Sequence, residues 1–326
     1  MIKSPNFWKQ TNILSLSLLP ISFIYLCILK LYQIFFKETF IDVPIICVGN
    51  IVVGGSGKTP MVIKLRKLLN NYNKIFVLTR GYKGSKRGPL IVSKNSTYQE
   101  VGDESLIHAK YGSTCVSKNK RLGAFLCKKE RADLIIMDDG LQSKDLVKKI
   151  RILVIDSDYG FGNNLLLPAG PLRDTIGHTI SECDFIIVFG NPKDDKFKRI
   201  TGKENLFFAQ KIITIKKLRK NKIYVFSGLG NNENFFNQLR KSKYEIIKFK
   251  TFPDHYDYSE NDLKNIVNEA KKYNLPIVCT EKDYVKVPKQ YKKQIYIAEL
   301  DIEIFSSKNF INSIKQRLVK SRFSHR

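Results

Sequence analysis

Residues 44–60, PIICVGNIVVGGSGKTP, decide the fold that we expect for this chain. The run from Pro44 to Val48 is short and apolar, as in a strand buried inside a parallel sheet. A glycine-rich turn follows and ends in Gly57-Lys58-Thr59, where small residues let backbone N–H groups close around phosphate oxygens. Pro60 suits the first turn of a helix, which can spare its N–H. The order of strand, loop and helix predicts a nucleotide-binding phosphate loop.

The residues of this loop are the candidates for holding the nucleotide: Val52, Val53, Gly54, Gly55, Ser56, Gly57, Lys58 and Thr59. Lys58 would reach the β- and γ-phosphates, and the Thr59 hydroxyl would ligate Mg²⁺. Val52 occupies the place of the first glycine in the strict G-x-x-x-x-G-K-[ST] pattern. A glycine-rich turn without a ligand is therefore the alternative interpretation.

A second apolar run delivers two acidic residues. Leu134 to Met137 have strand character and are followed directly by Asp138, Asp139 and Gly140. Ligands bind outside the carboxyl ends of the strands in open α/β sheets, and Mg²⁺ needs a carboxylate reached directly or through water. We expect Asp138 and Asp139 to face the phosphate loop and to hold Mg²⁺ or support a base, without a division of these roles.

The remaining apolar runs of strand length alternate with helical stretches, and they lie at residues 75–78, 152–155, 185–189, 223–226, 246–249 and 277–280. This alternation predicts a P-loop NTPase-like, doubly wound and mostly parallel α/β sheet. A chain of 326 residues is also longer than one core usually organises. We expect an N-terminal helix (1–37), a nucleotide-binding domain (38–220) and a smaller C-terminal α/β lobe (221–326) that closes over the site.

The first forty residues contain an uncharged apolar run from Ile13 to Leu29, flanked by lysines. As a helix it would reach about 26 Å, the short end of a bilayer span. We expect a membrane-associated helix that continues to Phe36. A cleaved signal peptide is the less favoured alternative, because no A-x-A-like site follows. Pro20 keeps open a helix that lies in the interface or packs on the protein.

The charge balance is strongly basic, with 56 Lys plus Arg against 30 Asp plus Glu and a net charge of +26. An anionic partner would explain this excess: nucleic acid, an acidic membrane surface or a phosphorylated substrate. The plain alternative is that the lysines are scattered over exposed faces without a common partner. No cationic tail or RNA-binding aromatic signature is present, so we expect no nucleic acid partner. The six cysteines form no C-x-x-C pair, which indicates a reducing compartment and no structural zinc site.

An ordered set of motifs resembles the tetraacyldisaccharide 4'-kinase family over the chain from the N-terminal apolar segment to about residue 288. The motifs are Val48-Gly49-Asn50, Gly54-Gly55-Ser56-Gly57-Lys58-Thr59-Pro60, Thr79-Arg80-Gly81-Tyr82, Val101-Gly102-Asp103-Glu104, Met137-Asp138-Asp139-Gly140-Leu141-Gln142, Leu167-Pro168-Ala169-Gly170-Pro171-Leu172-Arg173-Asp174, Phe252-Pro253-Asp254-His255-Tyr256 and Thr280-Glu281-Lys282-Asp283. The absence of the first loop glycine is itself a feature of this family.

The resemblance implies an ATP-dependent kinase, a phosphotransferase with an alcohol group as acceptor. It would transfer the γ-phosphoryl group of ATP to the 4'-hydroxyl of a tetraacyl glucosamine disaccharide 1-phosphate in lipid A (lipopolysaccharide) biosynthesis, with Mg²⁺ as cofactor. An acylated substrate lies in the bilayer, so the N-terminal helix would bring the enzyme to the cytoplasmic face of the bacterial inner membrane. We expect no obligate protein partner.

The same resemblance suggests which residues act. Asp103 is the candidate base for the sugar hydroxyl, and His255 is the partner that orients it or relays a proton. The plainer alternatives are a helix N-cap for Asp103 and a surface loop position for His255. The other candidates are Lys58, Asp138, Asp139 and Arg173 for catalysis, Thr59, Asp138, Asp139 and Glu104 for the metal, and Arg80, Arg121 and Asp174 for the substrate; Lys118 and Lys120, beside Arg121, are expected in a solvated loop.

Three other functions compete with this hypothesis: a membrane-tethered P-loop nucleotide switch, another P-loop small-molecule kinase and a nucleic-acid-binding ATPase. GTPases mark guanine with an [NT]-K-x-D motif, and Thr280-Glu281-Lys282-Asp283 has its lysine one place too late. The nucleic-acid-binding ATPase is motivated only by the net charge.

Overall fold

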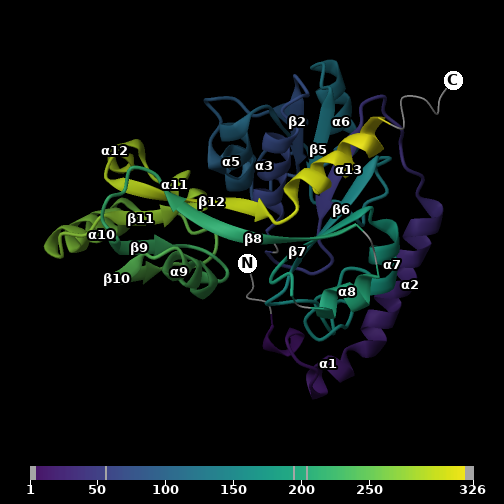
Figure 1. Ribbon diagram of the computed structural model, residues 1–326, viewed down its shortest axis with the longest axis horizontal. Helices are drawn as coiled ribbons and strands as arrows, with labels where there is room; N and C mark the ends of the chain where they lie inside the picture. The colour runs from purple at the N-terminus through teal and green to yellow at the C-terminus, as the bar shows by residue number, and fades with distance from the viewer. Residues whose placement is uncertain (1–4, 56, 194, 203–204, 320–326) are drawn as a thin grey trace.

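One sheet runs through the part of the chain that the computed structural model describes, residues 5–55, 57–193, 195–202 and 205–319. Within that part it has twelve strands in the order β10-β9-β11-β12-β8-β7-β6-β1-β5-β2-β4-β3 (Figure 1). Strands pair in parallel except β8 with β12 and β3 with β4. This arrangement confirms the prediction of a mostly parallel α/β sheet.

The nucleotide-binding half of the sheet consists of β1 (Ile45–Gly49), β2 (Ile75–Thr79), β3 (Leu90–Ile91), β4 (Thr114–Val116), β5 (Leu134–Asp138), β6 (Ile150–Asp156) and β7 (Phe185–Phe189). Every residue of β1, β2, β5 and β7 is buried. Continuous apolar runs form these strands because helices cover both faces of the sheet. The ends of β1 and β5, which are neighbours, bring the phosphate loop beside the tandem acids.

The helices of this half are α3 (Lys58–Leu68), α4 (Tyr98–Val101), α5 (Asp103–Tyr111), α6 (Lys120–Lys129), α7 (Ile176–Glu182) and α8 (Asp195–Thr201). Met61, Val62 and Leu65 of α3 are fully buried in one apolar cluster with β1 and β5. Their helical spacing presents one face to the sheet, as the sequence predicts. The packing fixes α3, and therefore Lys58 at its first turn, against the central strands.

The C-terminal lobe contains β9 (Lys222–Ser227), β10 (Glu245–Thr251), β11 (Ile277–Thr280), α9 (Asn232–Lys241), α10 (Glu260–Lys272), α11 (Glu281–Tyr284) and α12 (Lys289–Lys292). Ser259 and Asp262 form the capping box at the start of α10 that their spacing indicates. The lobe has its own apolar cores, one around Phe226 and Leu263 and one around Val225 and Phe236.

Two ten-residue strands, β8 (Leu206–Ile215) and β12 (Ile295–Ile304), connect the two halves. They pair antiparallel from Ala209 with Ile304 to Ile215 with Ala298. The last helix, α13 (Ser307–Val319), then returns to the first half, where Phe310 and its neighbours join the core of β6 and β7. The segment 307–319 therefore packs with the nucleotide-binding domain, although the boundary at 221 groups it with the C-terminal lobe.

The N-terminal segment forms η1 (Asn6–Trp8), α1 (Ile13–Ser17) and α2 (Leu19–Phe35) instead of one helix over 13–36. The break falls at Leu18, directly before Leu19 and Pro20, which occupy the first turn of α2. Pro20 has no N–H to donate to the preceding turn, which weakens the helix at this point. None of the helices in the described residues is both long and apolar enough to cross a membrane.

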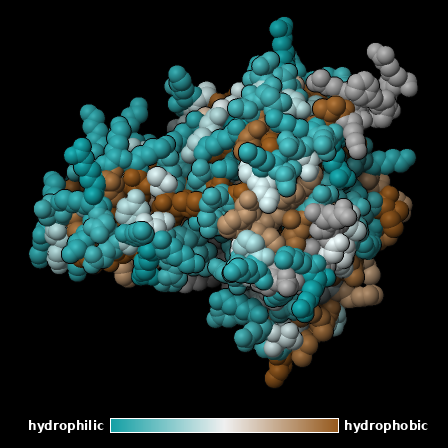
Figure 2. All heavy atoms as spheres, in the orientation of Figure 1, coloured by the Kyte–Doolittle hydropathy of each residue, from teal (hydrophilic) through white to brown (hydrophobic). Residues whose placement is uncertain are grey.

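Apolar side chains of α1 and α2 are exposed, among them Ile13 (87%), Phe23 (67%) and Phe35 (75%). Figure 2 shows the hydrophobic surface gathered along these helices, away from the mostly hydrophilic C-terminal lobe. The opposite side of α2 is tied to the protein, because Ser22 donates to Leu166 O at 3.0 Å and Tyr25 donates to Arg173 O at 2.7 Å. The helix is thus docked by polar contacts and leaves an apolar side uncovered.

Candidate active site

The phosphate loop needs its glycines for two different reasons. Gly57, which caps α3, has a φ of +87°, and a Cβ there would lie 2.6 Å from Phe189. A Cβ at Gly54 or Gly55 would meet nothing within 4 Å, so the space beside the loop is open to an incoming phosphate. Ser56, which was also predicted to contact the nucleotide, lies outside the described residues.

A buried asparagine organises the loop from inside. Asn50 is fully buried, and its amide donates to Val52 O at 2.7 Å. Its carbonyl accepts from Lys58 Nζ at 2.9 Å. Val52 packs in an apolar cluster and Val53 N donates to Pro171 O at 2.9 Å. The two valines shape the loop through packing and backbone contacts, and Asn50 holds the Lys58 ammonium at the start of α3.

Asp138, at the end of β5, faces the phosphate loop as expected. Thr59 Oγ1 donates to Asp138 Oδ2 at 3.2 Å. The same oxygen lies 2.7 Å from Nε2 of His108, a fully buried side chain of α5. The sequence analysis missed His108. A single histidine in the helical stretch 103–111 carries no motif, and its partner comes from a strand that begins more than twenty residues later.

Asp139 adopts a φ of +67° and turns toward Arg173. The Arg173 guanidinium donates to both Asp139 oxygens, at 3.1 and 2.9 Å. Burial would raise the pKa of the Asp139 carboxyl, but the charges of Lys58 and Arg173 outweigh it and lower that pKa to about 2. Lys120 donates to the backbone carbonyl of Asp139 at 2.7 Å. Lys120 is buried at the start of α6, so the expected solvated loop is wrong for this residue.

Asp103 and His255 come together from the two halves of the protein. His255 Nδ1 lies 2.7 Å from Asp103 Oδ2, and both side chains are almost fully buried. Burial opposes a charge on Asp103, yet the hydrogen bond from His255 and the charge of Lys282 hold its pKa below the ordinary 3.8. Asp103 is the first residue of α5 rather than its N-cap, and the His255 side chain is only 6% exposed, so the surface position is wrong for it.

Glu104 follows Asp103 in the first turn of α5, and its side chain is 34% exposed. Burial raises the pKa of its carboxyl, and the charges of Asp138 and Asp103 raise it further, against the lowering effect of Lys282. A cation near Glu104 and Asp138 would relieve this repulsion. Among the described residues no cluster of three or more His, Cys, Asp or Glu could hold a metal by itself. Mg²⁺ at phosphate sites usually takes one or two carboxylates and completes its shell with phosphates and water, which fits Thr59 and Asp138.

A cavity of about 700 Å³ opens between α2 and the end of the sheet. Its lining combines Tyr25 and Tyr32 of α2 with a mostly polar floor of Val53, Arg80, Lys118, Asn119, Lys120, Asp139, Gly140, Gln142, Ser143, Asp145, Leu167 and Arg173. Four of these residues are cationic and two are acidic, so the floor favours an anionic ligand. Arg80 and Arg173, both predicted for phosphate contacts, line this cavity.

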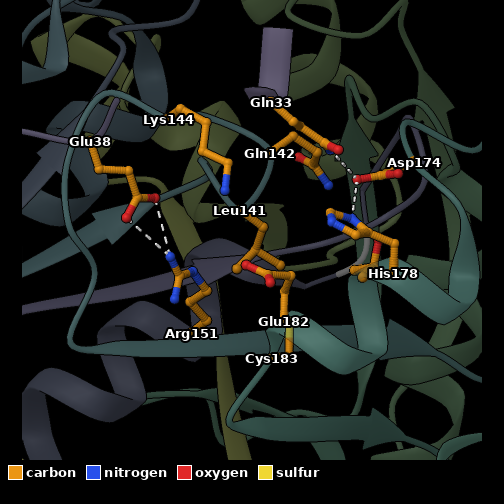
Figure 3. Close-up of a pocket in the computed structure, with 11 residues that line it drawn as sticks. Gln33, Glu38, Leu141, Gln142, Lys144, Arg151, Asp174, His178, Glu182 and Cys183 are labelled. Carbon is orange, nitrogen blue, oxygen red and sulfur yellow. Dashed lines mark hydrogen bonds and ion pairs between the residues drawn. The ribbon is translucent and has the colours of Figure 1, made fainter. Parts of the chain in front are cut away.

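The other two substrate candidates lie outside the cavity lining. Arg121 is half-exposed, 4.0 Å from Asp145. Asp174 is 3% exposed and lines a much smaller pocket, shown in Figure 3. There it accepts from Gln33 of α2 at 3.0 Å and contacts His178 of α7 at 2.8 Å. Asp174 therefore joins α2 to α7, and its carboxylate is occupied by these contacts.

Comparison with known proteins gives a consistent result. A family model described as tetraacyldisaccharide-1-P 4'-kinase matches residues 14–319. The tetraacyldisaccharide 4'-kinase of Rickettsia canadensis is 36% identical over 319 residues, which is 97% of this chain and 96% of that protein. The kinase of the same name from Rickettsia bellii is 38% identical over 285 residues, or 87% and 89% of the two chains.

A solved structure agrees with the fold as well as the sequence. It is the crystal structure of LpxK from Aquifex aeolicus in complex with ATP, described as an "apo" form. The TM-score is 0.77 at 27% sequence identity, and the match covers 94% of this chain and 99% of that one. The similarity therefore extends over both halves of the sheet.

Proposed function

We propose, from the premise that this chain belongs to the tetraacyldisaccharide 4'-kinase family, that it phosphorylates the 4'-hydroxyl of a tetraacyl glucosamine disaccharide 1-phosphate with ATP. The reaction is a phosphoryl transfer to an alcohol in lipid A biosynthesis. Family membership removes the case for a nucleotide switch or a nucleic-acid-binding ATPase, since no feature of the site favours either.

The observation that carries the proposal is the convergence of a phosphate loop, a tandem acid pair and a buried Asp–His pair at one edge of the sheet. Lys58 and Thr59 come from α3, Asp138 from β5, and Asp103 from α5. Lys58 acts electrostatically on both Glu104 and Asp139. Phosphoryl transfer needs positioned cations and an acceptor for the hydroxyl proton, and these residues supply both.

In this mechanism the side chains and the loop backbone bind the ATP phosphates, orient the catalytic base and deprotonate the sugar hydroxyl. The loop backbone and Lys58 would hold the β- and γ-phosphates, while Arg80 and Arg173 would neutralise phosphate charge on the cavity side. Asp103, ionised because its pKa is lowered, would accept the proton of the sugar hydroxyl. His255 would fix the orientation of the Asp103 carboxylate. The Arg173–Asp139 ion pair would keep the guanidinium at the boundary between the loop and the cavity.

Mg²⁺ belongs to the same proposal. Thr59, Asp138 and Glu104 would hold it, with Asp139 nearby, because they place a hydroxyl and carboxylates beside the phosphate loop. When bound, the ion would neutralise charge on the phosphate oxygens. The raised pKa of Glu104 supports a cation at this place.

We also propose that the chain works on the cytoplasmic face of the bacterial inner membrane, held there through α1 and α2. Support comes from their exposed apolar side chains and from the position of α2 along the cavity that would take the substrate. An acylated disaccharide could enter from the lipid side, with its phosphate directed to the cationic floor.

One assay tests the reaction directly. Purified protein is incubated with radiolabelled ATP and the tetraacyl disaccharide 1-phosphate, and the position of the new phosphate is fixed by mass spectrometry. We expect a 4'-phosphate that depends on Mg²⁺. Transfer to another hydroxyl, or ATP hydrolysis without transfer, would contradict the proposed reaction.

A second assay tests the membrane proposal. Flotation with vesicles that contain anionic lipid should recover the wild type, and the double variant Phe23→Ser/Phe35→Ser should float less. Phe305→Ser is the matched control, because Phe305 is an exposed phenylalanine outside the N-terminal helices. Equal flotation of all three proteins would reject α1 and α2 as the membrane contact.

A further inference from the structure

Lys282 lies against the Asp103–His255 pair but has no part in the mechanism above. Its Nζ atom is 3.0 Å from His255 Nε2, 3.5 Å from Asp254 Oδ1 and 3.8 Å from Glu104 Oε1. The side chain is 19% exposed. The amine faces the carboxylates of Asp254 and Glu104 and, like an ordinary lysine side chain, is an ammonium at neutral pH.

The contact with His255 restricts where the imidazole proton can be. An ammonium group has hydrogen-bond donors and no acceptor. A ring nitrogen 3.0 Å from it must therefore accept, which puts the single proton of a neutral imidazole on the other nitrogen, Nδ1. Nδ1 is the atom that lies 2.7 Å from Asp103 Oδ2. A doubly protonated ring would present an N–H to the ammonium. Asp254 Oδ1, the acidic oxygen that also faces Nε2, is 3.8 Å away and too far to accept from it, so the contacts favour the neutral ring.

We propose that Lys282 is a positioning residue that holds His255 in the neutral Nδ1–H tautomer, so that the ring donates to Asp103 and cannot take up a proton at Nε2. The inference rests on the role of Asp103 as the base in the proposed function. It decides between the two roles that the sequence left open for His255. The ring orients the base and keeps its own proton, and the proton of the sugar hydroxyl stays on Asp103.

The attachment of α11 explains how Lys282 is held in place. Asp283, fully buried, accepts from Gly228 N at 3.1 Å, Tyr258 OH at 2.7 Å and Thr280 Oγ1 at 2.7 Å. These bonds fix α11 to its own lobe. The backbone that carries Lys282 is therefore anchored, and this places its side chain against His255.

The neighbouring residue fixes α11 to the other half of the protein. Glu281 accepts from Lys110 Nζ and Tyr111 OH, each at 2.9 Å, at the carboxyl end of α5. Lys282 reaches the amino end of the same helix, where Asp103 and Glu104 lie. Two consecutive residues of α11 thus contact both ends of the helix that carries the base.

The test combines a spectrum with kinetics. Protein labelled with ¹⁵N-histidine, free of ATP and disaccharide, is examined by long-range ¹H–¹⁵N NMR, and His255→Gln identifies the His255 signals among the four histidines of the chain. We expect a protonated Nδ1 and an unprotonated Nε2 in the wild type. Lys282→Arg, which also offers only donors, should keep this pattern, and Lys282→Met should lose it.

The same variants separate positioning from nucleotide binding. Lys282→Met should lower kcat by about 10²-fold, the lower end of what a well-positioned proton acceptor contributes, with the KM for ATP nearly unchanged. Lys282→Arg should recover most of kcat. Lys264→Met is the matched control, since Lys264 is an exposed lysine of α10 in the same lobe.

Three results would overturn the proposal: a wild-type His255 with its proton on Nε2, a Lys282→Met variant with wild-type kcat, or a Lys282→Arg variant as impaired as Lys282→Met. If Lys282→Met does not fold, the wild-type and Lys282→Arg spectra decide. The spectra need no acceptor substrate, so a failure of the proposed reaction is distinguishable from a failure of this inference.

Discussion

Replacing Asp103 by Asn and His255 by Gln, singly and together, measures whether the two lobes contribute to one catalytic unit. The side chains are 2.7 Å apart and almost fully buried, so water does not take the place of a missing partner. Asn at 103 keeps the shape of the side chain and its hydrogen-bonding oxygen but cannot accept the hydroxyl proton. Gln at 255 can still donate to Asp103, but it is not held as rigidly as the imidazole.

The expected loss of kcat in each variant follows from these contacts. A positioned base contributes about 10²–10⁴-fold to a rate, so Asp103→Asn should lower kcat within that range. We expect His255→Gln to lower it by about 10²-fold, which is about 3 kcal/mol at about 1.4 kcal/mol per factor of ten. Because His255 acts only through Asp103, the double variant should be no slower than Asp103→Asn alone. The coupling energy should therefore be about 3 kcal/mol.

The assay is the initial rate of disaccharide phosphorylation at saturating ATP, together with thermal melting of each variant to confirm folding. Glu260→Gln serves as the control for loss of an acid in the C-terminal lobe, because Glu260 is exposed on α10. Additive losses, in which the double variant is slower by the product of the two single effects, would refute the reasoning. Such a result would mean that the two residues act on separate steps.

Three other changes test the remaining contacts. Lys58→Ala should lower kcat by about 10²-fold or more in the same assay through the lost charge on the phosphates, and normal turnover would exclude the loop as the phosphate site. Phe310→Ala should cost about 3–5 kcal/mol in urea unfolding, because Phe310 is fully buried against Phe185 and Phe207; a cost under about 1 kcal/mol would contradict the docking of α13. For Asp139→Asn, the lowering of the pKa from 3.8 to about 2 corresponds to about 2 kcal/mol. That stability is present above pH 3.8 and disappears as the pH falls through about 2, so the urea-unfolding difference from the wild type should shrink over this interval rather than stay constant.

The nucleotide-binding half of the fold was predictable from local sequence. β1 and the first four residues of β5 are apolar runs. Gly57-Lys58-Thr59 comes in the loop and helix start after β1, and Asp138-Asp139 stands at the end of β5, so both motifs mark the carboxyl edge of the sheet. Parallel pairing of these strands is enough to bring the two motifs together. The sequence order therefore contained the essential geometry of the phosphate site.

Contacts between distant elements were not readable in the same way. Nothing near His108 or Lys120 in the sequence indicates that each would contact the Asp138–Asp139 pair, since both contacts depend on how α5 and α6 pack. Pro20 indicated a weakness in the N-terminal helix, but not that the chain would divide at Leu18. The family motifs pointed to Asp103 and His255, while their separation of 2.7 Å needed the structure.

The antiparallel pairing of β8 and β12 limits how far the two lobes can move relative to each other. The two strands are paired at seven positions between the lobes, so the connection is a stiff ribbon and not a flexible linker. Twisting such a ribbon by a small angle is inexpensive, whereas a wide swing would break its ladder. The two lobes are therefore joined by a continuous ladder, and any opening between them has to be a small twist of this ribbon.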